Sequence, residues 1–251
     1  MRGLWLALGL ATRLPIPDPG PVAAAELATA VTWLPVVGAL LGAILVGVDS
    51  FAERVLPGPT ACAGVVLVWV ALTGGTPLVS VVRVCQAVAD RRLRWRVRAG
   101  RREGERTWIG GAIGLGTLLM KFGLLAVLPA AHRWEVLLLA PIWGRQAGAA
   151  ALLLAPFGAA TPERLRGLRE ATSKRQLWMA ALPLVLSGLV WRAWTAPVVI
   201  VLAPGLWWTL RRLAQILEGL TADTAEAVAE WTELLVLMCL VALLAGQPEG
   251  V

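Results

Sequence analysis

Long runs of apolar residues recur along this chain and favour a fold embedded in a membrane. Apolar residues make up 58% of the 251 residues and charged residues only 16%, which is more apolar surface than one soluble core can bury. A helix of about 20 residues crosses a bilayer core of roughly 30 Å. We therefore predict an all-α, polytopic integral membrane helical bundle with about seven transmembrane helices, near Val31–Val48, Ala61–Val82, Ile109–Leu128, Val136–Ala155, Leu177–Val190, Thr195–Leu210 and Thr232–Ala245.

The pattern also indicates a single domain over residues 1–251, because no internal repeat and no long linker divides the chain. The first apolar run, Leu4–Leu14, is too short to span a bilayer. Several prolines follow it without a small-residue cleavage site, so we predict an interfacial or re-entrant helix rather than a signal peptide.

Lysines and arginines are distributed unevenly over the predicted loops. Only Arg54, Arg133 and Arg192 fall on one side of the membrane, and the other side receives Arg2, Arg13, the loops Arg91–Arg106 and Arg164–Arg175, and Arg211 with Arg212. By the positive-inside rule the basic loops are cytoplasmic, and with seven spans the C-terminus lies outside. The net charge of +7 then reflects topology and contact with anionic membrane lipid, and no nucleic acid is expected as a partner.

The usual residues of metal and hydrolase sites are scarce. Cys62, Cys85 and Cys239 lie in separate apolar stretches, so we interpret them as small hydrophobic side chains. One histidine, His132, excludes a histidine metal centre and a Ser/His/Asp triad. The glycines at 110, 111, 114 and 116 follow no strand, so we predict close helix packing rather than a phosphate loop.

Three cationic residues, Arg83, Lys121 and Arg145, lie in or at the ends of predicted spans. Ionisable groups in a membrane interior usually face a polar cavity or a partner. A cavity with these cations would suit a phosphate-bearing substrate. Alternatively, Arg83 extends to the interface while Lys121 and Arg145 pair with acids on neighbouring helices.

A row of carboxylates follows near the C-terminus. Asp223, Glu226, Glu230 and Glu233 are spaced three, four and three residues apart, which places them on one helical face within roughly an 80° arc. Either a hard cation such as Mg²⁺ or pairing with the arginine-rich loop Arg91–Arg106 would relieve their repulsion. We expect Asp223, Glu230 and Glu233 to converge near Lys121 or Arg145.

The order of these features resembles the cobalamin synthase (adenosylcobinamide-GDP ribazoletransferase) family along nearly the whole chain. The resemblance rests on Thr12-Arg13-Leu14-Pro15, on Pro35 with Gly38 and Gly42, on Thr73-Gly74-Gly75, on Lys121 and Arg145 within spans, and on Thr221-Ala222-Asp223-Thr224 followed by Glu230 and Glu233. It implies a transferase in the bacterial inner (plasma) membrane that joins adenosylcobinamide-GDP to α-ribazole, or its phosphate, and releases GMP with the help of Mg²⁺.

The resemblance also implies roles for particular residues. Lys121 and Arg145 are the catalytic candidates, Arg13, Thr221 and Thr224 are the substrate-binding candidates, and Asp223, Glu226, Glu230 and Glu233 are the metal candidates. Glu226 is an acid where the family tends to have glycine.

The chain departs from the family where the first aspartate motif is expected. Pro77 stands at the histidine position, and Val79, Arg83 and Gln86 stand at the three aspartate positions. The segment Glu103–Thr107 replaces a second acidic motif and keeps one acid. Three interpretations follow: a transferase of the family, a catalytically inactive paralogue that binds corrinoid or partner enzymes, and a small anion transporter that uses Lys121, Arg145 and Arg83.

Overall fold

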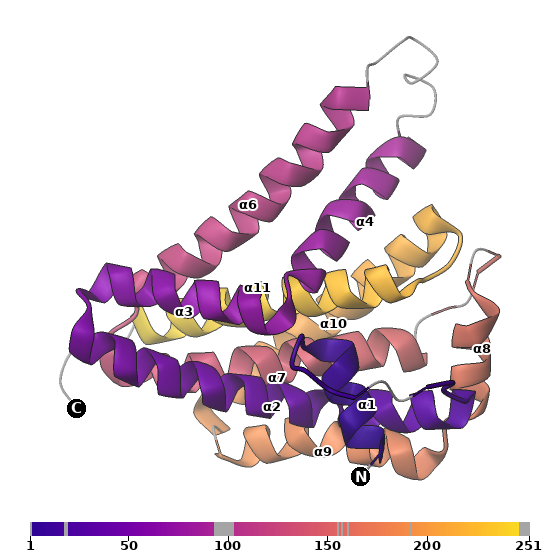
Figure 1. The fold of residues 1–251 in the computed structure, drawn as a ribbon, viewed down its shortest axis with the longest axis horizontal. Coiled ribbons are helices and arrows are strands. Elements are labelled where there is room, and N and C mark those ends of the chain that lie inside the picture. The colour runs from indigo at the N-terminus through magenta and orange to yellow at the C-terminus, as the bar shows by residue number, and fades with distance from the viewer. Residues whose placement is uncertain are drawn as a thin grey trace.

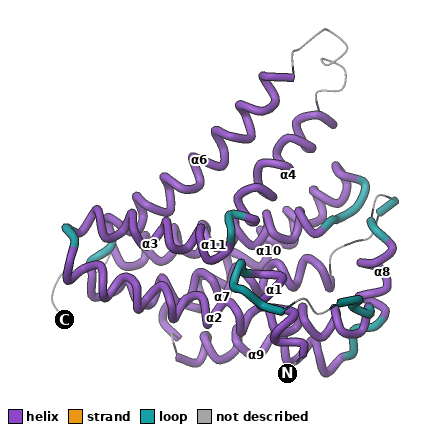
Figure 2. Tube along the Cα trace, viewed as in Figure 1, coloured by secondary structure: helices purple, strands orange, loops and turns teal. Residues whose placement is uncertain are grey.

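The computed structural model describes residues 2–17, 20–92, 103–154, 156, 158–159, 161–190 and 192–245, which form helices joined by short turns, with no strand among them (Figure 1, Figure 2). The helices are α1 (Arg2–Ala11), α2 (Ala24–Val55), α3 (Gly58–Thr73), α4 (Thr76–Arg92), α6 (Glu103–Val127), α7 (Ala130–Leu154), α8 (Glu163–Glu170), α9 (Lys174–Val190), α10 (Arg192–Leu217) and α11 (Ala222–Ala245).

Helix α7 packs against both α2 and α11 and forms the centre of the bundle. Gly38 and Gly42 of α2 lie directly on the α7 backbone, where an added Cβ would come within 2.9 Å and 2.8 Å of the Cα atoms of Ile142 and Leu138. Gly144 on α7 is equally close to α11, since a Cβ there would lie 2.9 Å from the carbonyl oxygen of Ala229. Glycines four residues apart allow such close approach, because no side chain separates the two backbones.

A sharp break separates α3 from α4. Gly74 and Gly75 have φ angles of 62° and 67°, in the left-handed region where a helix ends, and the two helices meet at 80°. The predicted span Ala61–Val82 is therefore wrong as one continuous helix: it is a bent pair with an interruption after Thr73. After the break α4 packs on α11, and its far end projects from the bundle (Figure 1).

The structure confirms a multi-pass helical membrane protein, but not the number of spans. Among the described residues, four helices are long and apolar enough to cross a membrane, and the bent pair α3–α4 brings the number to five. These four are α2, Gly110–Val127 of α6, α7 and Ala222–Leu244 of α11. The predicted spans Leu177–Val190 and Thr195–Leu210 lie in α9, which has only 17 residues, and in α10, which carries Arg211 and Arg212, and neither is among the candidate spans.

The N-terminal helix α1 is short and apolar, as predicted for an interfacial or re-entrant segment. It packs on α2 and buries Leu6, Ala7, Leu8 and Ala11. The chain leaves α1 toward the end of α3, because the backbone N–H of Arg13 donates to the carbonyl oxygen of Leu72 at 2.9 Å.

Helices α4 and α6 lie side by side and project from the bundle (Figure 1). Gly110 and Gly114 face Val82, and a Cβ at either position would lie 2.6 Å or 3.1 Å from its methyl groups. The prediction of close helix packing is confirmed for these two glycines, whereas Gly111 and Gly116 have open space. Most of the predicted arginine-rich loop, residues 93–102, lies outside the described residues.

A buried ion cluster joins α2, α3 and α7 at the far end of the bundle. Arg133 lies 3.5 Å from a carboxylate oxygen of Asp49, contacts Glu53, and donates to the sulfur of Cys62 at 2.9 Å. Cys62 is buried and accepts this hydrogen bond, whereas Cys85 and Cys239 are partly buried. The charges of this cluster compensate one another, and among the described residues no carboxylate of α11 takes part in it.

Candidate functional site

The start of α11 is fixed by a turn and a side-chain cap. Glu218 and Gly219 have φ angles of 58° and 144° and reverse the chain after α10. The hydroxyls of Thr221 and Thr224 then accept reciprocally from each other's backbone N–H, each at 3.3 Å, in the manner of an N-terminal cap. Thr224 is fully buried. Substrate binding by these two threonines stays a prediction, and their structural role is to set where the carboxylate row begins.

The inner half of the row is a buried triad. The ammonium group of Lys121 lies 2.7 Å from Glu230 and 2.7 Å from Glu233, and all three side chains are at most 5% exposed. The ring of Trp69 covers the same ammonium group at 4.2 Å from its centroid. Lys121 therefore has two carboxylates and an aromatic face as partners, and its positive charge is fully compensated.

Arg145 of α7 pairs with Glu226, the next carboxylate of the row toward the start of α11. Its guanidinium donates to Glu226 at 3.0 Å and approaches the carbonyl oxygen of Ala11 at 3.5 Å. Arg145 is 1% exposed, and it sits beside Gly144 at the closest approach of α7 and α11. The interpretation that Lys121 and Arg145 pair with acids on a neighbouring helix is confirmed.

The outer end of the row, Asp223 of α11, is exposed and has its partners on α4. Asp223 accepts from Arg83 at 3.3 Å and from the hydroxyl of Ser80 at 3.2 Å. The expectation that Asp223 joins Glu230 and Glu233 near Lys121 or Arg145 is not confirmed, since its partners among the described residues are Arg83 and Ser80 of α4. In the sequence analysis Arg83 was noted as the replacement of a family aspartate. Its pairing with Asp223 was not predicted.

All four carboxylates of the row thus have a lysine or an arginine as partner. From the predicted partner loop Arg91–Arg106, Arg91 pairs with Glu218 at 2.7 Å, just before the row. Residues 93–102 of this loop lie outside the described residues, so its pairing with the row itself stays a prediction. Within the described part of the chain no group of three or more His, Cys, Asp or Glu side chains is arranged to hold a metal ion. Magnesium binding by the row stays a prediction, and the donor set described here does not fit it.

A cavity of about 610 Å³ opens at the outer end of the row. It lies between the N-terminal segment, the first turns of α2 and α4, helix α8 and the start of α11. Its charged lining residues are Arg13, Arg83, Arg164, Asp223 and Glu226. Val79, at one of the altered aspartate positions, also lines it.

Arg164 was assigned from sequence only to a basic loop, and its place in the cavity was missed. It lies in the first turn of α8, which packs on α2. No sequence signal connects α8 with α4 and α11. Only the packing of the helices brings Arg164 to the cavity that Arg83 also lines. By contrast Arg13, a predicted substrate-binding residue, does line the cavity.

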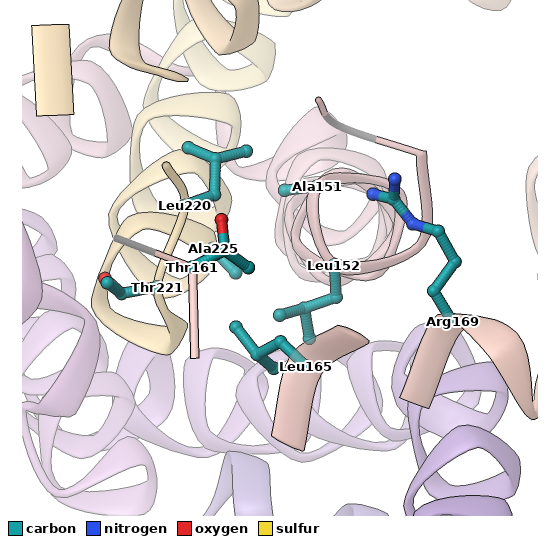
Figure 3. A pocket seen from close by; sticks show the side chains of 8 residues that line it. All are labelled: Ala151, Leu152, Thr161, Leu165, Arg169, Leu220, Thr221 and Ala225. Carbon is teal, nitrogen blue, oxygen red and sulfur yellow. The ribbon is translucent and has the colours of Figure 1, made fainter. Parts of the chain in front are cut away.

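A second, much smaller pocket lies next to the cap of α11 (Figure 3). Ala151, Leu152, Thr161, Leu165, Arg169, Leu220, Thr221 and Ala225 line it. Its volume of about 10 Å³ is that of a single water molecule. Burial lowers the pKa of the Arg169 guanidinium from its ordinary value. This pocket is too small for a nucleotide. A further pocket of about 510 Å³ between α10 and α11 has no charged residue in its described lining, so the arginine-lined cavity is the candidate ligand site.

The fold and the cavity together define a class: a multi-pass helical membrane protein with an arginine-lined cavity at one end of its bundle. The family model described as cobalamin-5-phosphate synthase matches residues 3–241. The chain belongs to this family, and the resemblance inferred from its motifs is confirmed.

Several relatives carry the name adenosylcobinamide-GDP ribazoletransferase. The protein from Synechococcus elongatus is 32% identical over 250 residues, which cover 94% of this chain and 96% of the relative. The Pseudomonas syringae protein is 30% identical over 255 residues, covering 97% of this chain and 100% of the relative. The Thiobacillus denitrificans protein is 32% identical over 247 residues, covering 93% and 92%. No solved structure matches the chain.

Proposed function

We propose that this protein is an adenosylcobinamide-GDP ribazoletransferase of the bacterial inner membrane. A hydroxyl of α-ribazole, or of its phosphate, would attack the cobinamide-linked phosphorus of adenosylcobinamide-GDP, and the bond to GMP would break. The observation that carries the proposal is the 610 Å³ cavity that Arg13, Arg83 and Arg164 line in a chain of this family. Anionic membrane lipid surrounds the protein, and the basic cavity faces the cytoplasm.

The chemistry requires that negative charge be stabilised on the diphosphate and on the departing GMP. Guanidinium groups do this by paired, charge-assisted hydrogen bonds to phosphate oxygens. Arg145 and Lys121 lie deeper and are already bonded to carboxylates, so in this proposal they hold α11 in place behind the cavity. Asp223 and Ser80 border the position that the reacting phosphate would occupy.

Magnesium, implied by the family resemblance, would supply further charge neutralisation when bound. The described residues do not fit it, because the cavity offers two carboxylates and both are bonded to arginines. We therefore expect the reaction to be slower than in a family member with an intact aspartate motif. Losing a metal's stabilisation of about 3–4 kcal/mol corresponds to a factor of roughly 10² to 10³ in rate.

The test uses the full chain purified in detergent with adenosylcobinamide-GDP and α-ribazole. Cobalamin and GMP should form in equal amounts, at a rate roughly 10² to 10³ below that of an intact family member assayed in parallel. Arg211→Ala is the matched control, because Arg211 stacks on Trp207 outside the cavity lining. Absence of product above a heat-inactivated sample would contradict the proposal.

A second candidate function is a non-catalytic relative that binds the corrinoid nucleotide without turnover. It is favoured by Val79 and Arg83, which line the cavity at positions where the family pattern has aspartates. Tight binding of adenosylcobinamide-GDP without release of GMP would establish this alternative. If the combined variant Val79→Asp, Arg83→Asp, Gln86→Asp then recovered transfer, the rest of the site would be shown to be arranged for the reaction.

A further inference from the structure

The cavity carries a surplus of positive charge. Arg13, Arg83 and Arg164 line it, against Asp223 and Glu226. Glu226 already accepts from the buried Arg145, which lies behind the cavity wall. Among the described residues neither Arg13 nor Arg164 has a carboxylate within ion-pairing distance. Two cationic groups in the cavity are thus available to an anion.

Arg13 is held in place by its backbone and by a glycine. Its N–H donates to Leu72 at 2.9 Å, and its side chain lies against Gly74, where a Cβ would collide with the arginine's own aliphatic carbons. Gly74 also has a φ of 62°, so another residue there would be strained as well as obstructive. The Thr73-Gly74-Gly75 turn therefore positions a cation although the acidic motif that it introduces in the family is missing.

Arg83 is the cation most easily released to a ligand. Its side chain is 62% exposed, and Asp223, its carboxylate partner among the described residues, lies at 3.3 Å. Exposed pairs of this kind contribute little free energy, so exchanging the carboxylate for a phosphate oxygen costs little. Asp223 keeps the hydroxyl of Ser80 as a donor after such an exchange.

A divalent cation has no comparable place here. Mg²⁺ prefers carboxylate, phosphate and water oxygens in an octahedral arrangement. Next to Asp223 it would meet the guanidinium of Arg83, whose like charge opposes it. Arg83, which stands at a family aspartate position, therefore supplies positive charge where a metal ion would have supplied it.

We propose that the cavity binds the diphosphate of its ligand through the guanidinium groups of Arg13, Arg83 and Arg164, without a divalent cation, and that Arg83 exchanges Asp223 for a phosphate oxygen. The inference deepens the proposed function and rests on it only for the identity of the natural ligand. Binding of a simple diphosphate tests it independently of transfer.

The experiment measures binding of GDP and of inorganic pyrophosphate to the full chain in detergent by isothermal titration calorimetry. In EDTA the dissociation constant for GDP should stay within about twofold of its value with added Mg²⁺, because the protein supplies the positive charge. GDP binding that appears only with Mg²⁺ would overturn the proposal, and so would the absence of binding of both ligands.

Two variants separate arginine binding from metal binding by the sign of their effect. Asp223→Asn frees Arg83 and should tighten GDP binding several-fold in EDTA, whereas loss of a metal ligand would weaken it. Arg83→Ala should weaken binding by at least about tenfold, since a charge-assisted contact is lost. Arg211→Ala should leave the affinity unchanged. Weaker binding by Asp223→Asn, or unchanged binding by Arg83→Ala, would overturn the proposal.

Folding of each variant is checked by its thermal unfolding midpoint, and Arg164→Gln replaces Arg83→Ala should the latter unfold. Arg164 is exposed on the first turn of α8, so its truncation leaves the bundle intact. Diphosphate binding in EDTA without transfer would support this inference and reject the proposed function. Transfer with strictly Mg²⁺-dependent binding would do the reverse.

Discussion

The two ends of the carboxylate row on α11 have the same chemistry and opposite surroundings. At the inner end Lys121, Glu230 and Glu233 are almost completely buried, whereas at the outer end Arg83 and Asp223 are 62% and 43% exposed. Separating a buried pair leaves an uncompensated charge in a medium of low polarity, but separating an exposed pair returns both groups to water. The comparison indicates that the inner end stabilises the helix arrangement and that the outer end is available to a ligand.

The largest expected effect is at the inner end. Lys121→Met should lower the free energy of unfolding by about 3–5 kcal/mol, because Glu230 and Glu233 would be buried without a cation. Unfolding by titration with sodium dodecyl sulfate in mixed micelles measures it. The combined variant Lys121→Met, Glu230→Gln, Glu233→Gln should recover most of the loss. A change below about 1 kcal/mol for Lys121→Met would remove the distinction between the two ends.

A smaller loss is expected midway along the row. Glu226→Gln should lower the free energy of unfolding by about 1–3 kcal/mol, since Arg145 loses its charged acceptor and keeps only a neutral one. The same titration measures it. Glu226 is partly accessible from the cavity, so the loss should fall below that of Lys121→Met. A loss equal to or larger than that of Lys121→Met would show that burial does not set the order.

At the outer end substitutions should scarcely affect folding. Arg83→Ala and Asp223→Asn should each change the free energy of unfolding by less than about 1 kcal/mol, as for other exposed ion pairs. The same variants change diphosphate affinity in opposite directions, so stability and binding separate at this position. If Asp223→Asn destabilised the protein as strongly as Lys121→Met, the outer pair would be part of the structural frame.

Salt should distinguish the two ends without any substitution. Raising the ionic strength from about 0.1 M to about 1 M shortens the Debye length from roughly 10 Å to 3 Å and should weaken GDP binding in the open cavity. The unfolding midpoint should change little, because the buried triad is shielded from mobile ions. Potassium chloride titrations followed by calorimetry and by thermal unfolding measure the two quantities. GDP affinity that is insensitive to salt would contradict the arginine site.

Much of the fold was predictable because its signals are local. Apolar length predicted the helical membrane class, and four of the predicted spans coincide with α2, α6, α7 and α11. The bend at Gly74–Gly75 was not predicted, since hydropathy continues through it while the backbone turns by 80°. The predicted count of seven spans is not confirmed for a related reason: α9 and α10 are apolar, but α9 is short and α10 ends in arginines.

The sequence by itself determined the family and the carboxylate face, because motif order and a spacing of three, four and three residues depend only on neighbours along the chain. For Lys121 and Arg145 it left two alternatives, a cavity for an anionic ligand or pairing with acids, and the structure shows the pairing. Only the tertiary structure decided that Arg83 lies on Asp223 and that Arg13 and Arg164 share its cavity. These three arginines come from segments up to 151 residues apart, and their meeting depends on the break before α4 and on the packing of α8 against α2.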